Sequence, residues 1–134
     1  MAKRLILLIW IVLMIFPIAG LGWIYPGLMV HFHRVFQSNA AHVVMHSLLF
    51  AGLVIILLAA FNMKPGRRSI AASFVAILVV AFLQEWLQAV SQEYSSFPGA
   101  LFDLGVDFLG GTVGYGMYVI LRFGGNVEMN GRQR

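Results

Sequence analysis

Four long apolar stretches dominate the sequence and restrict it to one class of fold. A helix needs roughly 20 mostly apolar residues to cross a membrane, and Leu5–Tyr25, His42–Phe61, Ile70–Val90 and Leu101–Phe123 each meet this length. Of the 134 residues, 60% are hydrophobic and 10% are charged, which is too little charge to cover a soluble domain. The sequence therefore predicts an all-α integral membrane bundle of four transmembrane helices, forming one domain over residues 1–123.

The basic residues between these stretches predict how the chain crosses the membrane. Cytoplasmic loops carry an excess of Lys and Arg, and only Arg34 among the nine basic residues falls on the opposite side from the rest. Both termini are therefore expected in the cytoplasm. The eight residues expected on the cytoplasmic side are Lys3, Arg4, Lys64, Arg67, Arg68, Arg122, Arg132 and Arg134.

The segments outside the apolar stretches give weaker predictions. Pro17 is expected to kink the first helix, and Pro26–Ala41 has apolar residues at helical spacing, which favours a short helix lying on the membrane. The Gly-, Asn- and Arg-rich residues 124–134 are expected to form a disordered cytoplasmic tail. A cleaved signal peptide is the alternative interpretation of the first stretch, because two basic residues precede it.

Composition also excludes several classes of function. The chain has no cysteine, which rules out disulfides, iron–sulfur clusters and cysteine nucleophiles. Its net charge of +4 does not indicate a nucleic-acid partner, because the basic residues flank apolar runs rather than clustering on one face.

Titratable side chains lie inside three of the apolar stretches. Glu85, Asp103 and Asp107 are notable because a carboxylate in hydrocarbon is costly and usually faces the protein interior or a wet cavity. His42 and His46 are spaced i,i+4 and so share a helix face, as do Asp103 and Asp107. A rise of 1.5 Å per residue places all five in the outer part of their helices. The sequence therefore predicts one polar cluster at the outer side of the bundle.

Glutamine and glycine residues extend this pattern. Gln88 shares a helix face with Glu85, and Gln84 lies beside them; hydrogen bonding between helices is the alternative role for these glutamines. Gly110 and Gly114 follow the aspartates as a small-x-x-x-small pair, which lets helices approach closely. The acidic face of the fourth stretch is therefore expected to point into the bundle.

Three motifs occur in a fixed order. They are a histidine-bearing apolar helix (AHVVMHSLLF, residues 41–50), a Glu-x-x-Gln helix (FLQEWLQ, residues 82–88) and an Asp-x-x-x-Asp helix running into glycine (FDLGVDFLGG, residues 102–111). Over residues 42–115 this arrangement resembles the VanZ-like family of small bacterial membrane proteins, named for an accessory protein of teicoplanin resistance. The chain departs from the family pattern in two ways: residues 95–100 lack the usual Arg, and Asp107 replaces the usual Asn.

The resemblance implies a multi-pass protein of the bacterial plasma (inner) membrane, linked to the cell envelope and to glycopeptide resistance. It does not supply a reaction. The favoured interpretation is binding of membrane lipids or a lipid-linked envelope precursor. The residues expected to bind this headgroup are His42, His46, Glu85, Gln88, Asp103 and Asp107.

Other functions stay open. One is a membrane-embedded enzyme acting on a lipid, with His46, Glu85, Asp103 and Asp107 as the candidate acid–base residues. Another is a small proton-coupled transporter, which at this chain length would need to form a homo-oligomer. A metal site on the two histidines with Glu85 or Asp103 has suitable donor chemistry, but the His-Glu-x-x-His motif is missing, so no metal or cofactor is assigned.

Overall fold

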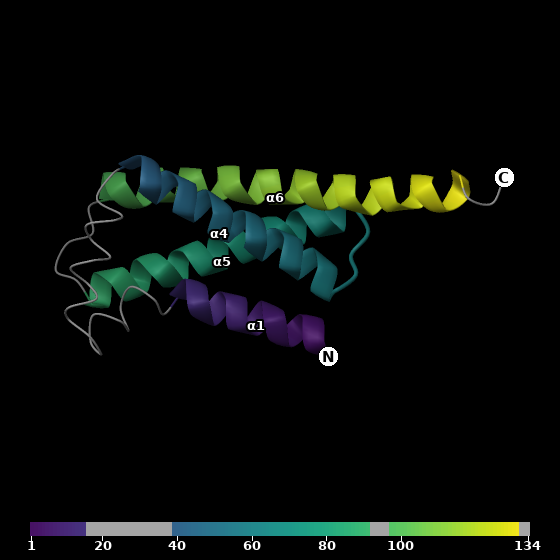
Figure 1. Cartoon of the computed structure of the whole chain (residues 1–134). Coiled ribbons are helices and arrows are strands. Elements are labelled where there is room, and N and C mark those ends of the chain that lie inside the picture. Colours follow the sequence, from purple (N-terminus) through teal and green to yellow (C-terminus); the bar gives the residue numbers. More distant parts are fainter. Residues whose placement is uncertain (16–38, 92–96, 132–134) are drawn as a thin grey trace.

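The computed structural model describes residues 1–15, 39–91 and 97–131, and within these ranges the chain is all-helical. Outside the described residues lie Pro17, Glu93 and positions 26–38 of the helix expected at Pro26–Ala41. The four helices, drawn in Figure 1, are α1 (Ala2–Ile15), α4 (Asn39–Ala60), α5 (Arg67–Ser91) and α6 (Phe97–Gly131).

Three of these helices, α4, α5 and α6, are long and apolar enough to cross a membrane. Large apolar side chains are exposed along them, including Val79, Leu109 and Ile120, as expected for helices that face lipid. The first of the four expected spans is described only over Ala2–Ile15, so the structure shows three candidate spans.

Helix α6 differs most from its expected bounds. It begins at Phe97, with Pro98 in its first turn, where the missing N–H of proline breaks no helical hydrogen bond. It ends at Gly131 rather than at Phe123, so the helix continues into the segment expected to be a disordered tail. Each glycine in residues 124–131 lowers helix propensity by about 1 kcal/mol relative to alanine. These residues contain no proline, which would interrupt a helix more strongly.

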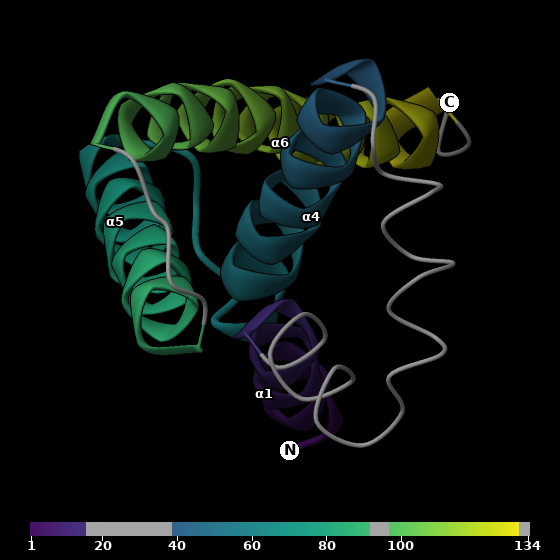
Figure 2. The same cartoon turned by 90° about the vertical axis from the view of Figure 1, so that its left-hand side faces the viewer.

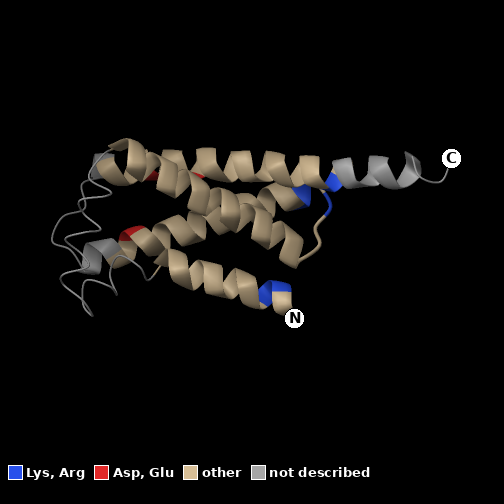
Figure 3. Ribbon diagram, in the orientation of Figure 1, with Lys and Arg blue, Asp and Glu red and all other residues tan. Residues whose placement is uncertain are grey.

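The described helices alternate in direction, as the loop charges suggest (Figures 1 and 2). The start of α1, the α4–α5 connection and the later part of α6 meet at one end, and Lys and Arg gather there, whereas Asp and Glu lie toward the other end (Figure 3). Helices α4 and α6 are therefore parallel to each other. We call the end of the bundle where Lys and Arg gather the basic end (Lys3, Arg4, Lys64, Arg67, Arg68 and Arg122). We call the opposite end of the bundle the acidic end (His42, His46, Glu85, Asp103 and Asp107).

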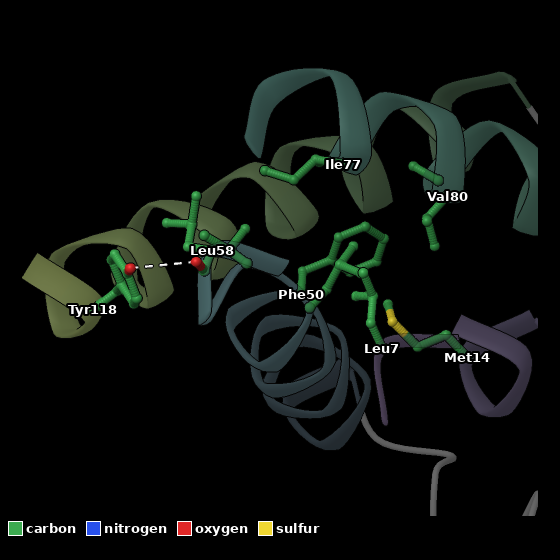
Figure 4. Packing of buried hydrophobic residues seen from close by; sticks show 10 residues of the cluster. Leu7, Met14, Phe50, Leu58, Ile77, Val80 and Tyr118 are labelled. Carbon is green, nitrogen blue, oxygen red and sulfur yellow. Dashed lines mark hydrogen bonds between the residues drawn. The ribbon is translucent and has the colours of Figure 1, made fainter. Parts of the chain in front are cut away.

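Helix α4 forms the centre of the apolar core. Its residues Phe50, Leu53, Val54 and Leu58 are fully buried, and they pack against Leu7 and Met14 of α1, Ile77 and Val80 of α5 and Tyr118 of α6 (Figure 4). Trp10 fixes α1 against α4, because its indole Nε1 donates a hydrogen bond to the Leu49 carbonyl at 3.1 Å.

Glycines allow α6 to lie directly on α4. A Cβ atom added at Gly110 would clash with the Ser47 backbone, and one added at Gly114 would clash with the Ala51 backbone. Both contact residues on α4 are small, so the expected small-x-x-x-small face of α6 meets a matching face on α4. The prediction that this side of α6 points into the bundle is confirmed.

The basic end is closed by a helix cap that α6 completes. Asn62 has φ 50°, in the left-handed region, and the Met63 N–H donates to Leu58 O while the Asn62 N–H donates to Ala59 O. This is the Schellman arrangement at a helix C-terminus. Tyr118 then donates to the Met63 carbonyl at 2.7 Å, and Arg122 donates to Asn62 Oδ1 at 2.7 Å, which places a cation at the negative end of the α4 dipole.

Candidate functional site

Two histidine–aspartate pairs connect α4 and α6 at the acidic end. His42 Nε2 is hydrogen-bonded to Asp103 Oδ1 at 2.8 Å, and His46 Nδ1 is hydrogen-bonded to Asp107 Oδ1 at 2.8 Å. The partners are 61 residues apart in both pairs. The two sequence separations are equal because α4 and α6 are parallel and each carries its polar residues at i and i+4. When one pair is in contact, the other pair is in contact as well.

The two pairs differ sharply in burial. The side chains of His46 and Asp107 are 4% and 3% exposed, whereas those of His42 and Asp103 are 35% and 18% exposed. The site thus runs from a half-open outer pair to a closed inner pair. Removing one partner from a buried pair is expected to cost about 3–5 kcal/mol, so the inner pair holds α4 and α6 together as well as offering chemistry.

The imidazole rings are also close to each other. The ring centroids of His42 and His46 are 4.3 Å apart with a tilt of 31°, and the His46 ring lies over Phe50 with centroids 6.4 Å apart. A ring nitrogen of His42, a ring nitrogen of His46 and a carboxylate oxygen of Asp103 all lie within 4.8 Å of one another. Of the two metal-donor sets expected from the sequence, the geometry favours the one with Asp103.

Glu85 lines a cavity next to these pairs. A cavity of about 370 Å³ lies between α5 and α6, and both Glu85 and Asp107 line it. Its remaining walls are apolar and consist of Leu78, Ala81, Phe82, Ala100, Leu101 and Leu104. Asp107 therefore takes part in both features, since it bonds His46 and also borders the cavity.

Of the glutamines, Gln84 has the interhelical role that the sequence left open. Its side chain is buried, and Nε2 donates to the Met14 carbonyl of α1 at 2.9 Å. Its Oε1 is buried with no hydrogen-bond partner among the described residues. Gln88 lies on α5, but its side chain is not among those that the structure describes.

The structure therefore brings His42, His46, Asp103 and Asp107 into direct contact and places Glu85 and Asp107 on the wall of one cavity. A polar group without a sequence prediction lies near the basic end. There Ser69 Oγ donates to the Gly66 carbonyl at 2.8 Å and lies 3.1 Å from the Tyr115 hydroxyl. The Gly66 N–H also donates to Ser69 Oγ at 2.9 Å, so Ser69 caps the start of α5 as the third helical residue of a capping box does, but its contact with α6 has no sequence signal.

Chemically, the acidic end offers imidazole nitrogens, carboxylates and an apolar cavity wall. The described Lys and Arg residues all lie at the basic end (Figure 3). This donor set suits a cation, a hydroxyl or an ammonium group better than a bare phosphate.

Comparisons with protein-family models, with curated proteins and with solved structures found no match to this chain.

Proposed function

We propose that this chain is a VanZ-like, four-span protein of the bacterial plasma membrane. In this proposal both termini are cytoplasmic, and the acidic end lies in the outer leaflet. The protein binds a membrane lipid or a lipid-linked envelope precursor there and serves cell-envelope physiology, including resistance to glycopeptides. The basic residues at the opposite end support this orientation, because such residues are retained in the cytoplasm.

The observation that carries the proposal is the cavity between α5 and α6. Its volume of about 370 Å³ is in the range of small-molecule sites, which typically combine apolar walls with a few polar groups. Here the apolar wall suits part of a lipid chain, and Glu85 and Asp107 suit a hydrogen-bond donor on the headgroup. Phe82 and Leu101 are exposed beside them, so a lipid would reach the cavity sideways from the bilayer.

The charge of the cavity predicts the class of headgroup. Both polar groups on its wall are carboxyls, and among the described residues no Lys or Arg lines it. A headgroup with an ammonium or several hydroxyl groups would supply donors to these oxygens. A lipid with a bare phosphate offers mainly acceptors and would be repelled.

Lipid binding to the purified protein tests this proposal. Native mass spectrometry would compare phosphatidylethanolamine with phosphatidic acid of the same acyl chains. We expect the ethanolamine lipid to be retained in preference, and Glu85→Gln and the cavity-filling Ala100→Leu each to weaken its retention.

A matched control is available on the same molecule. A second cavity, of about 510 Å³, lies among α1, α4 and α5 and has no charged residue on its wall. Filling it with Ala76→Leu should leave retention unchanged. Equal retention of both lipids, or equal effects of Ala76→Leu and Ala100→Leu, would contradict the proposal.

The cellular role has its own test. Glu85→Gln and Asp103→Asn would be compared with wild type for sensitivity to envelope-directed antibiotics and for pools of lipid-linked precursors. We expect both changes to reproduce the effect of deleting the protein. Full activity of both variants alongside a clear deletion phenotype would rule out the role proposed for the acidic end.

An enzyme is the second candidate, and the His46–Asp107 pair favours it. A carboxylate that bonds one imidazole nitrogen orients the ring, so the other nitrogen can act as a base. This function would differ from binding in one observable, because a bound lipid would be converted into a product of different mass.

A further inference from the structure

The feature that goes beyond lipid binding is the group formed by His42, His46 and Asp103. We propose that these three residues bind a divalent late first-row transition metal ion, of which Zn²⁺ is the closest chemical match. This site is distinct from the α5–α6 cavity, because none of the three residues lines that cavity.

Distance is the first argument. Ligand atoms from all three residues lie within 4.8 Å of one another. Zinc binds nitrogen and carboxylate oxygen at about 2.0–2.2 Å in a tetrahedral arrangement, which places ligand atoms about 3.4 Å apart. The most widely separated ligand atoms must therefore approach by up to about 1.4 Å, and His42, whose side chain is 35% exposed, has room to move.

The contact between His42 and Asp103 needs a small change in the opposite direction. Its 2.8 Å between Nε2 and Oδ1 is shorter than the roughly 3.4 Å between ligand atoms of a tetrahedral ion, so the two side chains would separate by about 0.6 Å. An ion between these atoms would replace their hydrogen bond with two coordination bonds.

Asp107 orients His46 for metal binding. Histidines that bind metals commonly donate their other ring N–H to a carboxylate, which fixes the ring and makes it a better ligand. His46 uses Nδ1 for Asp107 at 2.8 Å in a fully buried contact, so Nε2 is the nitrogen left to coordinate. Asp107 is therefore assigned a positioning role, and it links the metal site to the cavity that it borders.

Donor chemistry selects the kind of ion. Two imidazoles and one carboxylate suit Zn²⁺, Co²⁺ and Fe²⁺, whereas Mg²⁺ and Ca²⁺ prefer oxygen ligands. Three protein ligands also leave a coordination position open, as in catalytic zinc sites. The partly exposed side of His42 and Asp103 is where a water or a headgroup oxygen would reach the ion.

The test uses the full chain in detergent, stripped with a chelator and then titrated with Zn²⁺ by calorimetry. We expect one Zn²⁺ per chain, with Co²⁺ giving a visible absorption spectrum typical of nitrogen and oxygen ligands, and no competition from Ca²⁺ at equal concentration. Failure to bind stoichiometric Zn²⁺, or equally tight binding of Ca²⁺, would overturn the proposal.

Variants separate a true site from general attraction of cations by carboxylates. His42→Ala and Asp103→Asn should each weaken Zn²⁺ binding at least about 100-fold, and Asp107→Asn should weaken it by about 10–100-fold while keeping one ion per chain. Thr112→Val, on an exposed residue of α6, is the control and should bind as wild type does.

His42 and Asp103 are partly exposed, so their variants remain informative even if changes at buried His46 prevent folding. Unchanged binding in His42→Ala, or complete loss in Asp107→Asn, would contradict the assignment.

Discussion

His46 and Asp107 lie 2.8 Å apart, and each side chain is less than 5% exposed, so α4 and α6 share a closed polar contact inside an apolar bundle. His42 and Asp103 make the same contact at the same distance one helical turn away, with 35% and 18% exposure. The described residues thus contain two histidine–aspartate pairs of equal length, which use different ring nitrogens and differ strongly in burial. This difference makes the energetic role of the buried pair measurable.

Breaking the inner pair should destabilise the protein far more than breaking the outer pair. We expect His46→Leu to raise the free energy of the folded state by about 3–5 kcal/mol, because it leaves the Asp107 carboxylate buried without its partner. His42→Leu should cost about 0–1 kcal/mol, because solvent can replace the lost contact. Unfolding in detergent micelles with chelator present would measure both.

A double-mutant cycle would show whether the effect belongs to the pair. His46→Leu with Asp107→Leu should be much less destabilising than the sum of the single changes, since no buried group is then left unpaired. Additive effects at the inner pair would show that His46 and Asp107 act independently.

Close packing of α4 and α6 should depend on two particular glycines. Gly110→Ala and Gly114→Ala would place a Cβ against the backbone of Ser47 and Ala51, which cannot move aside as a side chain can. We expect each to cost about 1–3 kcal/mol of stability by overpacking.

The same helix provides the controls for this prediction. Gly105 and Gly116 have open space where a Cβ would go, so alanine there should be neutral or stabilising by up to about 1 kcal/mol through helix propensity. Thermal unfolding of the four variants would compare them. Equal melting temperatures for all four would show that α6 does not rest on α4 through Gly110 and Gly114.

The cap of α4 should be sensitive to the residue at position 62. Asn62 has φ 50°, a conformation that costs other L-residues roughly 1–2 kcal/mol. Asn62→Val should therefore destabilise the protein by at least this amount, and it also removes the acceptor for Arg122. Asn62→Gly keeps the backbone relaxed and removes only that acceptor, so it should be clearly milder. If the two variants unfold at the same temperature, the backbone conformation is not what the asparagine provides.

Helical periodicity predicted which residues share a face, and the structure confirms this for the histidines, the aspartates and the paired glycines. Spacing within one helix could not predict which helix would supply each partner. The sequence placed His46 near Glu85 as readily as near Asp107, and only the parallel packing of α4 on α6 decides between them. The contact of Asn62 with Arg122 is likewise a long-range feature with no local signal.

The lipid-facing surface was predictable only in part. Val79 and Ile55 both lie in apolar stretches whose sequence is compatible with facing lipid. Val79 is exposed, whereas Ile55 is half-buried against the core, because α4 is covered by α1, α5 and α6 on several sides. An apolar helix has no sequence contrast between lipid and protein neighbours, so the central helix of a bundle cannot be identified from hydrophobicity.

The orientation in the membrane can be tested with reporter fusions. Fusions after Lys64 and after Phe123 should read as cytoplasmic, because Lys and Arg gather at that end of the bundle. A fusion near Ser95 should read as external. An external reading after Phe123 would place the basic end outside and contradict the proposed topology.

Lipid binding in the α5–α6 cavity is tested most directly by mapping a photoreactive lipid on the protein in its membrane. A phosphatidylethanolamine with a photoreactive group close to its headgroup would be crosslinked and the modified peptides sequenced. If lipid binds at the acidic end, adducts should form on the walls of the α5–α6 cavity, at Phe82–Glu85 and Ala100–Leu104, and Glu85→Gln should reduce them. Adducts concentrated instead on the α1–α4–α5 cavity around Ala72–Ala76, or spread evenly over exposed apolar residues, would contradict this binding site.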